Sequence, residues 1–137
     1  MKIEEKIKKW SKSKWKKEAW KYCSIYNRKK DADWKGKAKC CTCGKEMDWN
    51  KGDAGHFQSG RGNSILFYDK GIHFQCKRCN GPGSGEQDLY RDYIEQRYGH
   101  EEVLYQRRLK KETKQYSIQD FVRIAERYKE KIKELNN

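Results

Sequence analysis

The chain has 137 residues, of which only 34% are hydrophobic, and its 33 Lys and Arg outweigh 20 Asp and Glu to give a net charge of +13. Such a chain can build one small core with appendages, and its positive excess favours a polyanion as partner because each neutralised phosphate releases condensed counterions. No apolar run approaches the roughly 18 residues of a membrane span, and the basic start MKIEEKIKKW lacks the apolar stretch of a signal peptide.

Composition also bears on the partner and the compartment. A membrane surface or a merely soluble basic protein are the alternatives to nucleic acid, and nine Tyr, five Trp and four Phe tip the balance toward nucleic acid, although aromatic residues also build cores. The missing export and membrane signals predict a cytosolic protein, in which thiols stay reduced. The six cysteines are therefore expected to be metal ligands in preference to a disulfide framework.

The N-terminal stretch, residues 1–27, is predicted to form a basic amphipathic helix. Ile3, Ile7 and Trp10 share one face, and lysines fill most other positions. This helix is either a solvated element docked by its aromatic residues or an arm that contacts the DNA backbone, and both can hold at once. Residues 28–39, RKKDADWKGKAK, keep neither helical nor strand periodicity and are expected to form a polar loop.

The central stretch, residues 40–85, is rich in Gly and Cys. Short strands are expected at SILFY (64–68) and GIHFQ (71–75), with DAGHFQS (53–59) as a third. Below roughly 40 to 50 residues burial alone rarely stabilises a fold, so this stretch needs a metal or disulfides.

The C-terminal stretch returns to helix. Residues 86–111 are expected to be helical with a break at Gly99, a residue suited to a helix C-cap. A last helix should start near Ser117, because Ser117 and Asp120 form the S-x-x-D pattern of a capping box. The expected organisation is a basic helix and loop over 1–39, a metal-bound core over 40–85 and a helical region over 86–137.

Two C-x-x-C pairs dominate the central stretch. Cys40 and Cys43 form the first pair, and Cys76 and Cys79 form the second. Two such pairs can meet as a tetrahedral thiolate cage, the arrangement that zinc prefers in structural sites. The alternative, four buried free cysteines, does not explain two matched pairs that are each followed by a glycine. A structural zinc is therefore expected, and a closed cage leaves no open position for chemistry.

Polar residues beside the cysteines indicate a second kind of site. Asp53, His56, His73 and Asn80 combine a carboxylate, an amide oxygen and imidazoles, the ingredients of a phosphodiesterase site that uses Mg²⁺ or Mn²⁺. A neutral histidine can take a proton from water. The alternative for His56 is a structural hydrogen-bonding role. Gly55 and Gly60 are expected to let a DNA backbone approach closely.

Several segments of the sequence resemble a known family. The segments DAGHFQSGRGN, GIHFQCKRCN and GSGE resemble the phage NinG family of recombination proteins (the Rap proteins of lambda-like phages). DADWKGKAKCCTCGK resembles that family before and through the first cysteine pair, and YRDYIEQRYGHEEV resembles its helix after the second. The resemblance covers roughly residues 20 to 135.

The resemblance implies a structure-specific DNA endonuclease for branched recombination intermediates such as Holliday junctions and D-loops. The implied fold is α+β, a zinc-bearing treble-clef ββα-metal (His-Me finger) core flanked by N- and C-terminal helices. Asn80 then matches a ligand of the catalytic metal and His56 the general base. The family also implies a phage or prophage origin, action in the host cytoplasm, a homodimer, and phage or host recombination proteins as partners.

Two positions depart from the related HNH pattern. Gly55 stands where an acid or a histidine often precedes the catalytic histidine, and Gly71 stands where the middle Asn is typical. Asp53 is the nearest acid, and His73 is a residue that could compensate for the missing Asn. Arg61 is a candidate phosphate contact, with Lys77 and Arg78 as weaker ones, and the alternative for each is a solvated charge.

Three functions are compatible with these features. The favoured one is a metal-dependent endonuclease in which His56 activates water and a divalent ion on Asn80 and Asp53 stabilises the leaving oxygen. The second is a zinc-dependent protein that binds branched DNA without cutting it, which the Gly55 and Gly71 departures favour. The third, a zinc ribbon or protein-interaction module, fits the basic flanking helices only if its partner is acidic.

Overall fold

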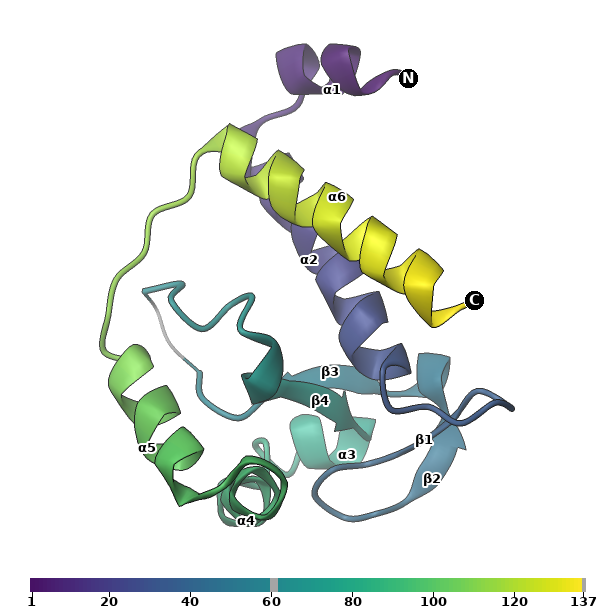
Figure 1. Cartoon of the computed structure of the whole chain (residues 1–137), viewed down its shortest axis with the longest axis vertical. Helices are drawn as coiled ribbons and strands as arrows, with labels where there is room; N and C mark the ends of the chain where they lie inside the picture. Colours follow the sequence, from purple (N-terminus) through teal and green to yellow (C-terminus); the bar gives the residue numbers. More distant parts are fainter. Residues whose placement is uncertain (60–61, 137) are drawn as a thin grey trace. The chain divides into compact units, whose positions relative to one another are not determined.

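The structure is a computed structural model that describes residues 1–59 and 62–136, and Figure 1 labels its elements. The described residues form a mixed α+β structure with six α-helices and two two-stranded antiparallel sheets, which confirms the expected class. The chain forms two compact units, one of residues Met1–Tyr26 with Gln115–Asn137 and one of Asn27–Lys114. The first unit combines parts of the expected segments 1–39 and 86–137, and the second contains parts of all three, whose boundaries stay predictions. Among the described residues, no helix has the length and apolar character needed to cross a bilayer.

The helical unit begins with two helices, so the prediction of a single helix over residues 1–27 is wrong. Helix α1 spans Ile3–Lys9, and α2 spans Lys12–Lys29 and so continues past the end of this unit. Trp10 adopts an extended backbone between them (φ −83°, ψ 138°). The Ser11 hydroxyl accepts a hydrogen bond from the Lys14 amide at 3.1 Å. A serine that offers its hydroxyl to an amide three residues later starts a new helix, which explains the break.

The last helix, α6 (Ile118–Leu135), starts where the sequence predicts. The Ser117 hydroxyl accepts from the Asp120 amide, and the Asp120 carboxylate accepts from the Ser117 amide, which completes the capping box. Its buried residues recur at helical spacing, as do those of α2. These are Phe121, Ala125 and Tyr128 on α6 and Trp15, Ala19 and Cys23 on α2.

The second unit contains both sheets. Strands β1 (Lys37–Lys39) and β2 (Glu46–Asp48) form a hairpin, and β3 (Asp53–His56) pairs with β4 (Ile72–Gln75). The strands expected in DAGHFQS and GIHFQ are confirmed. The prediction of a polar loop over residues 28–39 is wrong at both ends, because α2 runs to Lys29 and β1 begins at Lys37.

The strand expected at SILFY (64–68) is also wrong. These residues form successive turns, in which the Leu66 amide donates to the Asn63 carbonyl and the Tyr68 amide donates to the Ile65 carbonyl. Ile65 and Phe67 are nevertheless buried. The apolar run therefore signalled burial, and Asn63, with a left-handed φ of 64°, helps the chain turn here.

Three helices complete this unit. The short α3 (Lys77–Asn80) follows β4, and α4 (Gln87–Tyr98) and α5 (His100–Leu109) follow in turn. Gly99 lies between α4 and α5 with a φ of +98°, so the predicted break is confirmed and its glycine is explained. A small apolar cluster packs α4 and α5 onto the loop after β3. It consists of Phe57, Tyr90, Ile94 and Val103.

Candidate metal centre

The four predicted cysteines come together. The sulfur atoms of Cys40, Cys43, Cys76 and Cys79 all lie within 4.8 Å of one another. Zinc–sulfur bonds of about 2.3 Å at tetrahedral angles place sulfur atoms about 3.8 Å apart. The Sγ atoms of Cys43 and Cys76 are 3.8 Å apart. The cluster thus has the spacing of a structural zinc site.

Both cysteine pairs make the amide-to-sulfur contacts typical of zinc knuckles. The Cys43 amide points at Cys40 Sγ (3.5 Å), and the Cys79 amide points at Cys76 Sγ (3.4 Å). Burial raises the pKa of Cys40, but a hydrogen bond from Thr42 and backbone amides outweigh it and lower this pKa below the usual value. Burial is also the main reason why the pKa of Cys79 is raised. A dication would let all four sulfurs ionise together.

The remaining cysteines are not part of the cluster. Cys23 lies in the helical unit, on α2. Cys41 packs against the apolar cluster of Phe57 and Tyr90, and burial raises the pKa of its thiol far above the usual value. The choice of Cys40 over Cys41 as the ligand is therefore supported by where the two thiols lie.

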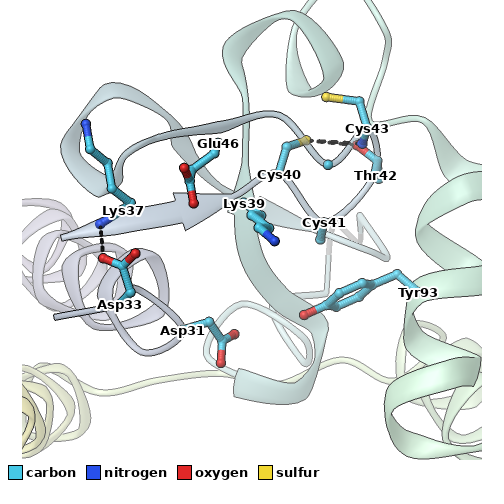
Figure 2. Close-up of a pocket in the computed structure, with 11 residues that line it drawn as sticks. Asp31, Asp33, Lys37, Lys39, Cys40, Cys41, Thr42, Cys43, Glu46 and Tyr93 are labelled. Atoms are coloured by element: carbon cyan, nitrogen blue, oxygen red, sulfur yellow. Dashed lines mark hydrogen bonds between the residues drawn. The ribbon is translucent and has the colours of Figure 1, made fainter. Parts of the chain in front are cut away.

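A cavity of about 710 Å³ borders one side of the cysteine cluster, and Figure 2 shows its lining. Asp31, Asp33 and Glu46 face it together with Lys37 and Lys39. This mixture of charges does not favour a polyanion, so the cavity is a poor candidate for the phosphate-binding surface.

Asp53 and Asn80 meet at the short helix that also carries Cys79 of the second cysteine pair. Asp53 is the first residue of β3, and Asn80 is the last residue of α3. The Asn80 side-chain nitrogen lies 3.2 Å from Asp53 Oδ2, and Lys77 Nζ lies 2.8 Å from Asp53 Oδ1. The single turn of α3 therefore places Cys79 in the cysteine cluster and its neighbour Asn80 beside the carboxylate.

The Asp53 carboxylate is ionised and accessible. Partial burial raises its pKa, but hydrogen bonds from Lys77 and Asn80 and the positive charge of Lys77 outweigh burial, so that the pKa lies below its usual value. Its side chain is 33% exposed. An accessible carboxylate next to an amide is a suitable pair of ligands for a hard divalent cation.

His56 lies at the other end of β3, in different surroundings. Its Nε2 atom is 3.1 Å from the Leu66 carbonyl oxygen, and burial lowers its pKa. It lines a small cavity of about 180 Å³ with Asn63 and Ser59. Side chains alternate between the faces of a strand, so Asp53 and His56, three residues apart, leave opposite faces of β3.

His73 is buried away from these residues. It is 1% exposed, its Nε2 atom lies 3.1 Å from the Lys70 carbonyl oxygen and 3.3 Å from the Tyr98 hydroxyl, and its Nδ1 atom lies 3.8 Å from Asp31. Burial lowers its pKa, and the nearby Asp31 carboxylate opposes this by raising it. Arg97 in turn holds Asp31 with two contacts of 2.7 and 2.9 Å. These surroundings suit a structural hydrogen-bonding role.

Packing explains the two glycines, Gly55 and Gly71, that differ from the HNH pattern. A Cβ atom on Gly55 would lie 2.1 Å from Gln75 Oε1, and one on Gly71 would lie 2.6 Å from Gln106 Oε1. The space over Gly55 is therefore taken by Gln75, and the expectation that it admits a DNA backbone is wrong for this residue. Gly60 lies outside the described residues.

Of the three candidate phosphate contacts, two can be placed. Lys77 pairs with Asp53, and Arg78 is exposed on α3. Arg61 lies outside the described residues. Sequence reasoning missed the contact network of Asp31 and Arg97 around His73, because its members lie far apart in the chain and carry no spacing signal.

Comparison with known proteins gives one clear result. Residues 2–137 match the family model described as "Bacteriophage Lambda NinG protein". No curated protein and no solved structure matches the chain.

Proposed function

This chain belongs to the NinG family of bacteriophage proteins, and from that premise we propose that it is a metal-dependent endonuclease for branched DNA. Its substrates would be recombination intermediates such as Holliday junctions and D-loops. The observation that carries the proposal is the contact between Asp53 and Asn80 directly beside the cysteine cluster. Two potential oxygen ligands next to a zinc-type cluster support a second metal site that serves the reaction.

The Asp53–Asn80 pair fits Mg²⁺ or Mn²⁺. Mg²⁺ keeps several waters and needs only one or two protein oxygens besides the substrate phosphate. Asn80 would turn its amide oxygen toward the ion, and Lys77, which now pairs with Asp53, would be released toward the phosphate. When bound, such a cation neutralises charge on the scissile phosphate and on the leaving oxygen.

His56 is the proposed general base. Its lowered pKa keeps the imidazole neutral near pH 7, as a base requires. If Nε2 carries the proton and donates it to the Leu66 carbonyl, Nδ1 is left as the atom that accepts a proton from water. Three residues of strand separate the Cα atoms of Asp53 and His56 by about 10 Å. We propose that one DNA strand contacts both residues across β3.

The order of elements supports a ββα-metal core. Strands β3 and β4 are followed at once by α3, with Asp53 and His56 on the first strand and Asn80 on the helix. In this proposal the thiolates of the four cysteines hold a structural zinc, and the core belongs to the treble-clef type. A homodimer would bring two such centres to the opposed strands of a junction, together with phage or host recombination proteins.

The second candidate is a zinc-dependent protein that binds branched DNA without cutting it. Two observations favour it: Asp53 and His56 leave opposite faces of β3, and His73 is buried away from both. Tight binding of junctions needs neither a general base nor a divalent cation.

A cleavage assay separates the two candidates. Labelled four-way junction, linear duplex and single strand are incubated with the zinc-loaded protein in Mg²⁺, in Mn²⁺ and without added divalent ions, alongside His56→Ala. The nuclease proposal expects metal-dependent cutting that favours the junction and falls by about 10²- to 10⁴-fold in the variant. Junction binding with no cutting in either metal would establish the binding protein instead.

A further inference from the structure

The turn that precedes β1 presents a tryptophan to solvent. Trp34 is 89% exposed, more than any other large apolar side chain among residues 1–59 and 62–136. We propose that Trp34 is a stacking residue that binds the face of an unpaired DNA base. The inference rests on the proposed function only in taking DNA as the partner, and it concerns a surface distinct from the cysteine cluster and the Asp53–Asn80 pair.

The turn that carries Trp34 is held by its own hydrogen bonds. Asp33 Oδ1 accepts from the amides of Lys35 and Lys37, both at 2.9 Å. The Asp33 amide donates to the Lys37 carbonyl at 2.8 Å, and the Gly36 amide donates to the Asp33 carbonyl at 2.9 Å. Gly36 has a φ of +79°, which explains the glycine. The exposure of Trp34 is thus a property of an ordered turn.

Two neighbouring residues anchor the turn to the rest of its unit. Lys30 Nζ donates to the carbonyls of Ile72 and Asp69, at 2.7 and 2.9 Å. Asp31 binds both Nη atoms of Arg97, at 2.7 and 2.9 Å. A ring presented on an anchored turn loses little conformational freedom when a ligand stacks on it, because the backbone is already fixed.

Cations surround the aromatic side chains at this turn. Lys35 Nζ lies 5.0 Å from the Trp34 ring centre. The Trp49 amide donates to the Gly36 carbonyl, and the Trp49 ring has Arg28 at 5.1 Å and Lys29 at 5.2 Å. Aromatic rings interleaved with cations are the pattern by which proteins bind single-stranded nucleic acid, since the rings stack on bases while the cations follow the phosphates.

Two acidic residues next to this turn are already engaged. Asp33 is used within the turn, and Asp48 pairs with Lys37 at 2.8 Å. The cations at Lys35, Arg28 and Lys29 therefore lie beside the two rings and can meet the phosphates of DNA.

An unpaired base is favoured over intact duplex as the ligand. Bases within a duplex have both faces covered by their neighbours, so an indole ring reaches the face of an unpaired base only in tails and at branch points. Branched recombination intermediates offer such faces. Trp34 would thereby contribute to selecting branched or tailed DNA over linear duplex.

Binding measured without cleavage tests this role. Fluorescence anisotropy compares a duplex carrying a single-stranded dT tail with a blunt duplex of equal total charge, at fixed salt and with no added Mg²⁺ or Mn²⁺. Trp34→Ala should bind the tailed duplex about 30-fold less tightly, the middle of the range for loss of one stacked base, and should bind the blunt duplex with unchanged affinity. Trp34→Phe should keep most of the preference.

The control is Leu89→Ala, which shortens another exposed apolar side chain (46% exposed) in the same unit and should leave both affinities unchanged. Equal losses of Trp34→Ala on both duplexes, or no loss on either, would overturn the inference. Because no cutting is measured, a failed nuclease proposal leaves this result interpretable, and a failed stacking test leaves the nuclease proposal standing.

Discussion

The cysteine cluster and the Asp53–Asn80 pair use the same short helix in opposite ways. Cys79 and Asn80 are adjacent on α3, yet Cys79 is buried among sulfurs and Asn80 contacts an ionised carboxylate that is one-third exposed. Soft thiolates in a closed set suit a permanent zinc, whereas accessible oxygens suit a cation that must also reach a phosphate. The difference shows that one turn of helix can connect a metal site that stabilises the fold, the cysteine cluster, to a candidate reaction site, the Asp53–Asn80 pair.

The comparison predicts that the two sites respond differently to mutation. Loss of a sulfur should remove folding energy, because the core at the cluster consists of the cysteines themselves with only Met47 packed against them among the described residues. Loss of Asp53 or Asn80 should leave the fold and remove only the reaction. Cys76→Ser and Asn80→Ala test the two sides of that contrast.

The largest effect is expected for Cys76→Ser. A structural zinc in a small domain contributes on the order of 10 kcal/mol of folding free energy, so loss of one ligand should unfold much of residues 27–114. Zinc content and far-ultraviolet circular dichroism measure this. Cys41→Ser, at the neighbouring thiol outside the cluster, should keep one zinc per chain. A Cys76→Ser protein with an unchanged spectrum would refute the structural role of the cluster.

The next effect is expected for Asn80→Ala. Cutting of a four-way junction should fall by roughly 10²- to 10⁴-fold, the range in which one essential group of a catalytic centre acts, while zinc content stays at one per chain. The matched control is Asn50→Ala, an exposed asparagine in the same unit, which should cut at the normal rate. Loss of zinc together with activity would show that Asn80 supports the cysteine cluster and does not act in the reaction.

A smaller effect is expected for Gly55→Ala. The new Cβ atom would lie 2.1 Å from Gln75 Oε1, so Gln75 must move and strain the packing on this face of β3. The unfolding free energy should fall by about 1–3 kcal/mol, the usual cost of overpacking, as measured by urea denaturation. The double variant Gly55→Ala with Gln75→Ala should recover part of the loss. Unchanged stability of the single variant would mean that the space over Gly55 is open.

Much of both sites could be predicted because their signals are local. The spacing within each C-x-x-C pair fixes which sulfurs converge, and Asp53 and Asn80 stand at the ends of elements that those pairs hold in place. The capping box of Ser117 and Asp120 is likewise readable within one helical turn. Local chemistry of this kind is independent of the rest of the fold.

The failures involve tertiary context. The apolar run SILFY predicted a strand, but its residues are buried in consecutive turns. The surroundings of His73 were not readable from the sequence either, because Asp31 and Tyr98, which lie next to it, come from distant parts of the chain. The glycine at position 55 depends on the side chain of Gln75, which no spacing rule reveals. To predict each of these features, one must know which segments of the chain meet in space.

The central claim is that Asp53 and Asn80 hold a divalent cation separate from zinc. Mn²⁺ bound to the zinc-loaded protein is best counted by electron paramagnetic resonance, with a four-way junction bound and in a His56→Ala background that prevents cutting. After subtraction of Mn²⁺ bound by the junction alone, we expect one Mn²⁺ per chain, which Asp53→Ala should abolish while zinc stays unchanged. Equal Mn²⁺ binding with and without Asp53 would contradict the account.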